Sequence, residues 1–143
     1  MDVKECFENR LLRKVPIDKE KIKNSLKISN NKLFRAKELL SKDFFEEALL
    51  SSYTSIFHAA RALLYAEGVQ EKSHYAVYVY LKEKYKKKIP NNLIEAFRNY
   101  QTERHNILYG FDRSVTREDT ESCLEDAELF ISKVREVLRD GEL

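Results

Sequence analysis

Apolar residues recur at spacings of three and four along most of this chain, which is the period of one face of an α-helix. The first such segment spans residues 21–41, and a longer one spans residues 44–67. Residues 92–109 and 116–139 carry the same period. Gly68 directly follows the second segment, where a residue with positive φ commonly ends a helix. The pattern therefore predicts long helices joined by short connections.

Residues 73–85 fit two kinds of structure. The run from His74 to Tyr80 is rich in residues that favour strands. However, Tyr78, Leu81 and Tyr85 also share a helical face, and a lone strand would have no partner. We therefore predict a helix here, with Ser73 as its N-terminal cap.

These segments predict an all-α fold. The chain has only three Gly and two Pro in 143 residues, so it lacks the many turns that an all-β fold needs. Short connections favour antiparallel neighbours, and we expect an up-and-down bundle of four to five helices. Residues 1–24 are expected to form an N-terminal leader that could hold one short helix, and residues 25–143 the helical domain.

The segment 44–67 carries a second stripe of small residues beside its apolar stripe. Small side chains let another helix approach closely. This stripe and the tyrosine-rich segment 73–85 together exceed what one thin bundle can bury, so we predict a homodimer. The small residues of this stripe are Ala48, Ser52, Ser55, Ala59, Ala62 and Ala66.

Charge and composition exclude several classes of protein. The net charge is +2, from 26 basic and 24 acidic residues, so any contact with RNA must come from a local patch. Two cysteines and three scattered histidines predict neither a disulfide framework nor a metal site. The chain has no glycine-rich phosphate loop, and we expect no cofactor. Without a signal peptide or a long apolar run, we expect a cytoplasmic protein with no membrane association.

The segment 98–109 carries the candidate chemistry. Cleavage of RNA without metal needs a base for the 2′-hydroxyl proton and cations that hold the phosphate. His105 could be that base, and Arg98 and Arg104 the cations, because all three lie near one helix end. The simpler interpretation is that Arg98 and His105 are solvated residues that suit the dipole of the helix C-terminus. Arg104 falls on the stripe of Phe97, so we expect its side chain to face inward towards a polar partner.

Other polar residues have simpler explanations. His58 lies on a mostly apolar helix, where a hydrogen-bonded core histidine is commoner than a ligand-binding one. His74 lies at a helix start and could be a cap or a surface residue. The lysine run at 82, 84 and 86–88 could touch phosphates, but such runs more often form a solvated face.

Three stretches of the chain carry a family resemblance: residues 43–48 and 53–64 with Gly68 after them, then Ser73 and His74, then residues 104–109. In this order they resemble the second helix, the step that opens the third helix, and the arginine-to-tyrosine motif of the fourth helix in the HEPN family of helical proteins. The chain most closely resembles the small stand-alone archaeal and bacterial members of that family, and the likeness covers roughly residues 25–139.

The resemblance implies a helical bundle, a homodimer and pairing with a minimal nucleotidyltransferase in a toxin–antitoxin or defence module. Many family members are metal-independent endoribonucleases that carry Arg, four to six residues, and then His, with both copies forming one cleft. Arg98 and His105 match this spacing. In a second register Arg104 is the motif arginine, and Tyr109 stands where nucleases carry His. We favour the second register, which lacks a general base.

The leading hypothesis is a homodimeric HEPN protein that binds nucleotide or RNA and pairs with a nucleotidyltransferase. The alternative is an endoribonuclease toxin with Arg98, Arg104 and His105 as catalytic residues. The residues expected to contribute to binding are Tyr109, Asn106, His74 and His58.

Overall fold

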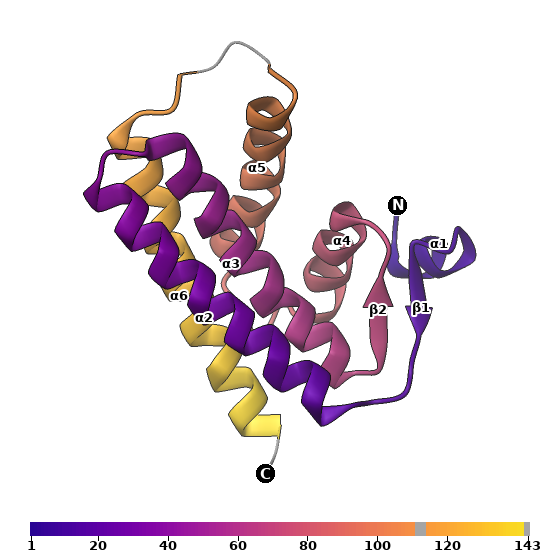
Figure 1. Ribbon diagram of the computed structural model, residues 1–143. Coiled ribbons are helices and arrows are strands. Elements are labelled where there is room, and N and C mark those ends of the chain that lie inside the picture. Colours follow the sequence, from indigo (N-terminus) through magenta and orange to yellow (C-terminus); the bar gives the residue numbers. More distant parts are fainter. Residues whose placement is uncertain (111–113, 142–143) are drawn as a thin grey trace.

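The computed structural model describes residues 1–110 and 114–141, and within them the fold is helical (Figure 1). Two three-residue strands form a small antiparallel sheet. The prediction of an all-α fold is confirmed. The elements are α1 (Val3–Glu8), β1 (Leu12–Lys14), α2 (Lys19–Ser41), α3 (Phe45–Ala66), β2 (Val69–Glu71), α4 (His74–Lys84), α5 (Asn91–Leu108) and α6 (Arg117–Gly141).

The helix α3 lies at the centre of the molecule. The long helices α2 and α6 pack against it, while α4 and α5 pack on its remaining sides (Figure 1). Fourteen of its 22 residues are buried, which explains why its sequence is apolar on nearly every face. No helix in the described part of the chain is long and apolar enough to cross a membrane.

The helix boundaries follow the predicted signals at most ends. The Ser73 hydroxyl accepts a hydrogen bond from the Ala76 amide at 3.3 Å, which confirms the cap of α4. Gly68 has a φ of +69° and follows α3 as expected. Pro90 precedes α5, and no side chain caps the start of this helix. The Glu95 carboxylate accepts a 2.9 Å hydrogen bond from the Tyr78 hydroxyl.

The first residues belong to the packed fold. The short helix of the leader ends at Glu8, because Arg10 takes a positive φ of 59° and the chain turns into β1. The strand β1 then pairs with β2, with Leu12 opposite Glu71. Val3 and Leu12 are buried, so this segment covers α4 and β2 rather than extending away from them. A domain boundary at residue 24 stays a prediction.

The stripe of small residues on α3 packs against α2 of the same chain. The Ser29 hydroxyl donates to the Ser55 carbonyl oxygen at 2.7 Å, across the contact of the two helices. The Ser51 hydroxyl donates to the Lys32 carbonyl oxygen at the same distance. Because α2 fills this stripe and Tyr78 lies in the core, these features give no reason for a dimer. A homodimer would have to use another surface.

An aromatic column connects α3 to α5 and α6. The ring centres of Tyr53 and Phe97 lie 5.7 Å apart and nearly parallel, and Phe97 lies 6.1 Å from Phe130. All three side chains are almost fully buried. This packing holds Tyr53 under the C-terminal half of α5, where the candidate catalytic residues lie.

Candidate functional site

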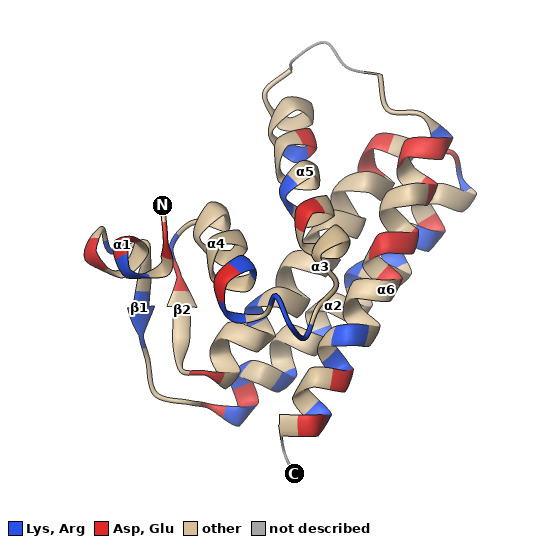
Figure 2. Cartoon of the chain, turned by 180° about the vertical axis from the view of Figure 1, so that it is seen from behind, with Lys and Arg blue, Asp and Glu red and all other residues tan. Residues whose placement is uncertain are grey.

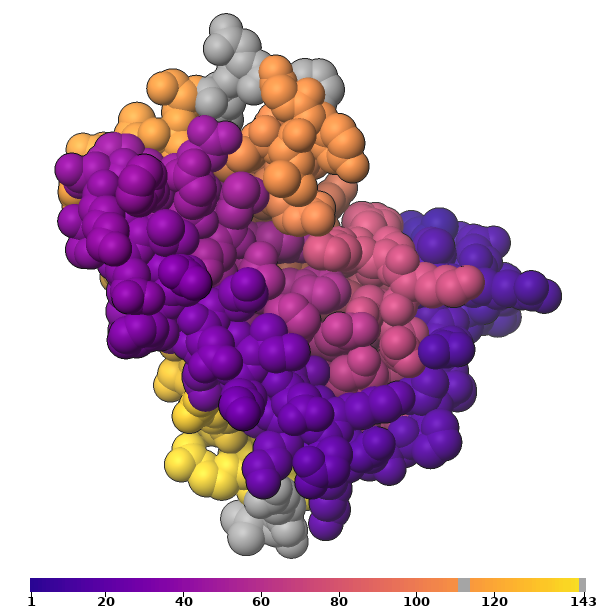
Figure 3. Space-filling view, in the orientation of Figure 1, coloured from indigo at the N-terminus to yellow at the C-terminus, as the bar shows by residue number. Residues whose placement is uncertain are grey.

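A pocket of about 460 Å³ lies where α3, the start of α4 and the second half of α5 meet. The space-filling view shows a recess in this part of the surface (Figure 3). Polar side chains from three separate elements converge here, which is the usual arrangement of a binding site. The lining residues are Tyr53, Ser73, His74, Tyr75, Arg98, Gln101, Thr102, Arg104 and His105.

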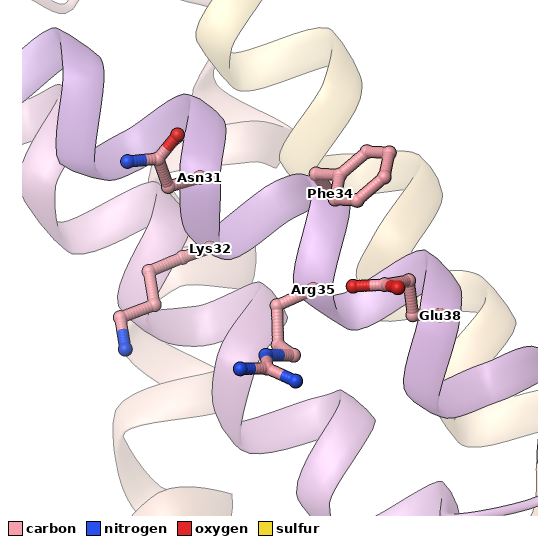
Figure 4. Close-up of a pocket in the computed structure, with 5 residues that line it drawn as sticks. All are labelled: Asn31, Lys32, Phe34, Arg35 and Glu38. Atoms are coloured by element: carbon pink, nitrogen blue, oxygen red, sulfur yellow. The ribbon is translucent and has the colours of Figure 1, made fainter.

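Two other pockets have a different lining. One of about 370 Å³ lies on the outer face of α2 and is lined by residues of that helix alone, among them Phe34 and Arg35 (Figure 4). A larger one, of about 590 Å³, lies between the start of α2 and the end of α6. Its lining contains aliphatic and lysine side chains but neither arginine nor histidine. The pocket at α5 is therefore the stronger candidate for chemistry.

His74 is held in the pocket by contacts from two helices. Its Nδ1 lies 2.6 Å from the Tyr53 hydroxyl oxygen, and its ring stacks on Phe57 with the centres 4.1 Å apart. Its backbone carbonyl oxygen accepts a hydrogen bond from the Gln101 amide nitrogen at 2.9 Å. Burial, and next the positive charge of Arg104, lower the pKa of His74 to about 4. The imidazole is therefore uncharged at neutral pH.

Both candidate arginines line the same pocket. The Arg98 guanidinium lies 4.8 Å from the centre of the Tyr75 ring and donates to the Gln101 side-chain oxygen at 3.1 Å. The Arg104 guanidinium lies 5.9 Å from the centre of the Tyr53 ring. Arg104 faces inward as expected but is half-buried rather than enclosed in the core. Its described contact is the aromatic face of Tyr53, which attracts a cation.

His105 is exposed and lines the pocket beside the arginines. Its ring lies 4.6 Å from the ring of Tyr109, which is 68% exposed at the end of α5. Tyr109 and the half-buried Asn106 do not belong to the pocket lining. The structure thus brings His105 together with both arginines. The two predicted binding residues Tyr109 and Asn106 lie outside the pocket lining.

His58 lies behind the pocket, next to Phe57. Its ring is nearly perpendicular to that of Phe57, with the centres 5.5 Å apart. Burial is the main cause of a lowered pKa, and Arg61 adds to it. The Nδ1 atom is buried and has no hydrogen-bond partner within the described residues. The expected hydrogen-bonded core histidine is therefore not observed, and His58 does not line the pocket.

Two further residues of the pocket, Tyr53 and Gln101, are not predicted from the sequence. Gln101 lies three residues after Arg98 and three before Arg104, so the helical period could have placed it on the same face. Tyr53 lies in a different helix, and no local pattern connects it to α5. These two residues hold the arginines and His74 in their positions.

The pocket offers cations and neutral hydrogen-bond donors rather than metal ligands. Within residues 1–110 and 114–141, no group of three or more His, Cys, Asp or Glu side chains could hold a metal ion. Of the lysine run, Lys82 and Lys84 lie at the end of α4, and residues 86–88 lie in the connection between α4 and α5 (Figure 2). Part of its charge is neutralised, since Lys82 pairs with Glu95 at 3.0 Å. Two guanidinium groups beside uncharged donors suit a phosphate group.

Comparison with known proteins identifies the family of the chain. The family model described as "HEPN domain" matches residues 22–137, which is most of the chain. A curated protein named "Putative toxin MJ0605", from Methanocaldococcus jannaschii, is 26% identical over 130 residues. The match covers 85% of this chain and 92% of that relative. This helical protein, with its arginines and histidine clustered near the end of α5, therefore belongs to the HEPN domain family.

Proposed function

We propose that this chain is the toxin-type HEPN component of a two-component module, and that it binds the phosphate groups of RNA or of a nucleotide in the pocket at α5. The observation that carries the proposal is the convergence of Arg98, Arg104, His74 and His105 on one pocket. The name of the archaeal relative supports a role as a toxin.

Phosphate binding follows from the charges in the pocket. Arg98 and Arg104 are six residues apart, and their side chains reach the pocket from one helix. Guanidinium groups donate two hydrogen bonds in a planar fork that matches phosphate oxygens. Tyr75 is 36% exposed beside Arg98, so its ring offers a face on which a base could stack.

A second candidate function is metal-independent cleavage of RNA. It is favoured by the exposure of His105 in the pocket next to two guanidinium groups. In this reaction His105 would take the 2′-hydroxyl proton, and the 2′-oxygen would attack the adjacent phosphorus. A 2′,3′-cyclic phosphate would form, and the leaving 5′-oxygen would take a proton from water. The arginines would stabilise the charge on the phosphate oxygens.

The proposal includes a homodimer and a nucleotidyltransferase partner, both in the cytoplasm. Leu108 and Tyr109 are 51% and 68% exposed at the end of α5, next to the pocket. Exposed apolar side chains beside a polar pocket suit a surface that another protein covers. A second copy of the chain bound there would bring two sets of arginines together.

Binding of single-stranded RNA in EDTA, measured by fluorescence anisotropy, tests the proposal. Arg98→Gln and Arg104→Gln should each weaken binding at least tenfold, the usual scale for a charge-assisted contact. The matched control is Arg135→Gln, because Arg135 is an exposed arginine on α6 outside the pocket. Equal losses in all three variants would indicate unspecific attraction and would contradict the proposed site.

A further inference from the structure

His74 follows the cap residue Ser73 and makes more contacts than the start of a helix requires. It begins α4, its ring lies flat on Phe57 with an interplanar angle of 11°, and Gln101 holds its carbonyl oxygen at 2.9 Å. The Tyr53 hydroxyl occupies Nδ1 at 2.6 Å. The ring nitrogen left for a ligand is therefore Nε2, in a residue that lines the pocket.

The chemistry of the two groups favours the Tyr53 hydroxyl as the donor in this short contact. Burial raises the pKa of Tyr53, so the phenol keeps its proton. An imidazole nitrogen accepts a hydrogen bond better than a phenol oxygen does, and a neutral imidazole carries only one N–H. When Nδ1 accepts from Tyr53, the single proton of the ring must lie on Nε2.

We propose that His74 is an uncharged N–H donor to a phosphate oxygen in the pocket, and that Tyr53 is the positioning residue that keeps the proton on Nε2. The ligand is a phosphate ester, either a diester of an RNA strand or the monoester of a nucleotide. This inference rests on the proposed function and names the group that His74 would bind.

The surroundings of His74 explain why a neutral donor is useful there. His58 and Arg61 face it from α3, and Arg98, Arg104 and His105 line the same pocket from α5. An imidazolium beside Arg98 and Arg104 would be repelled and would weaken their hold on a shared anion. An uncharged N–H can bind the same phosphate without that cost. The contribution of His74 should therefore not change between pH 5.5 and 8.

The first test reads the proton position directly, without a ligand. Nitrogen-15 NMR of histidine-labelled protein should show His74 as the Nε2–H tautomer, with no titration between pH 5.5 and 8. Tyr53→Phe should shift His74 towards the Nδ1–H tautomer, because the hydroxyl donor is lost. The control is Tyr80→Phe, which removes a hydroxyl bound to Glu67 at 2.7 Å outside the pocket. A wild-type Nδ1–H tautomer, or titration of His74 near pH 6.5, would overturn the inference.

The second test is binding, with a ribodinucleotide as the diester and adenosine monophosphate as the monoester. His74→Gln places an amide N–H near the position of Nε2, whereas His74→Asn places it nearer Nδ1. We expect His74→Gln to keep most of the affinity, and His74→Asn and Tyr53→Phe to lose about three- to tenfold, the range of one neutral hydrogen bond. Equal affinity of the Gln and Asn variants would contradict the inference.

The two ligands also distinguish the possible sources of the phosphate. Tighter binding of the dinucleotide would identify an RNA strand as the source of the phosphate, and tighter binding of the monoester would identify a nucleotide. If the wild type binds but Tyr53→Phe behaves like Tyr80→Phe, the inference fails and the proposed function stands. If the wild type binds neither ligand, the proposed function fails and the inference fails with it.

Discussion

The guanidinium group of Arg104 lies 5.9 Å from the centre of the Tyr53 ring. Arg104 belongs to α5 and Tyr53 to α3, and no local sequence pattern connects the two helices. Tyr53 thus contacts two polar residues of the pocket, with its ring face towards Arg104 and its hydroxyl towards His74. The loss of either contact should therefore affect binding in the pocket more than it affects the stability of the fold.

Arg104→Ala should lower the free energy of unfolding by about 1 kcal/mol, the usual range for a partly exposed contact between a cation and a ring. A buried ion pair would instead cost about 3–5 kcal/mol when one partner is removed. Urea denaturation followed by circular dichroism measures the difference. A loss of 3 kcal/mol or more would place Arg104 in a buried charge network that the half-buried side chain does not suggest.

Purified protein should bind single-stranded RNA in EDTA without cutting it. If Arg104 is the motif arginine, Tyr109 stands where nucleases of the family carry the histidine base. Gel analysis of end-labelled RNA measures cleavage. If cutting occurs, His105→Ala should slow it by roughly a hundredfold or more, the scale for a lost general base, while Tyr109→Phe should matter little. Cleavage that resists EDTA and is lost in His105→Ala would make the nuclease the leading function. The control is His58→Ala, since His58 lies outside the pocket.

The fold should lose stability as the pH falls from about 6.5 to about 4. The folded protein holds the pKa of His74 near 4, below the ordinary value of 6.5, so over this range protons bind the unfolded chain more readily. The unfolding free energy should fall by about 2 kcal/mol across this window and not at higher pH. His74→Gln should flatten the dependence in urea titrations at pH 7, 5.5 and 4.5. The lowered pKa of His58 acts in the same direction, so some dependence should remain.

Light scattering at micromolar concentration should give twice the chain mass if the end of α5 is a dimer surface. Leu108→Glu and Tyr109→Glu should then produce monomers, because each puts a charge on an exposed apolar residue of that surface. The control is Phe34→Glu, at a residue 65% exposed on α2. A wild-type mass of one chain would exclude a cleft built from two copies. Dissociation by Phe34→Glu alone would move the interface to α2.

The helices follow from the sequence alone, because the signals that form and end them are local. The period of apolar residues located α2, α3, α5 and α6, and Ser73 and Gly68 marked two ends that the structure confirms. The proximity of Arg98 and His105 is also visible in the sequence, since residues seven apart on a helix share a face.

The partner that each helical face meets depends on the packing of the whole chain. The period shows that the small stripe of α3 is covered, but not that α2 of the same chain covers it, and so a dimer was expected for the wrong reason. Likewise, the pairing of Tyr53 with His74 spans 21 residues, and it depends on how α4 packs on α3. Such contacts follow from the shape and packing of whole helices, and no spacing within one helix encodes them.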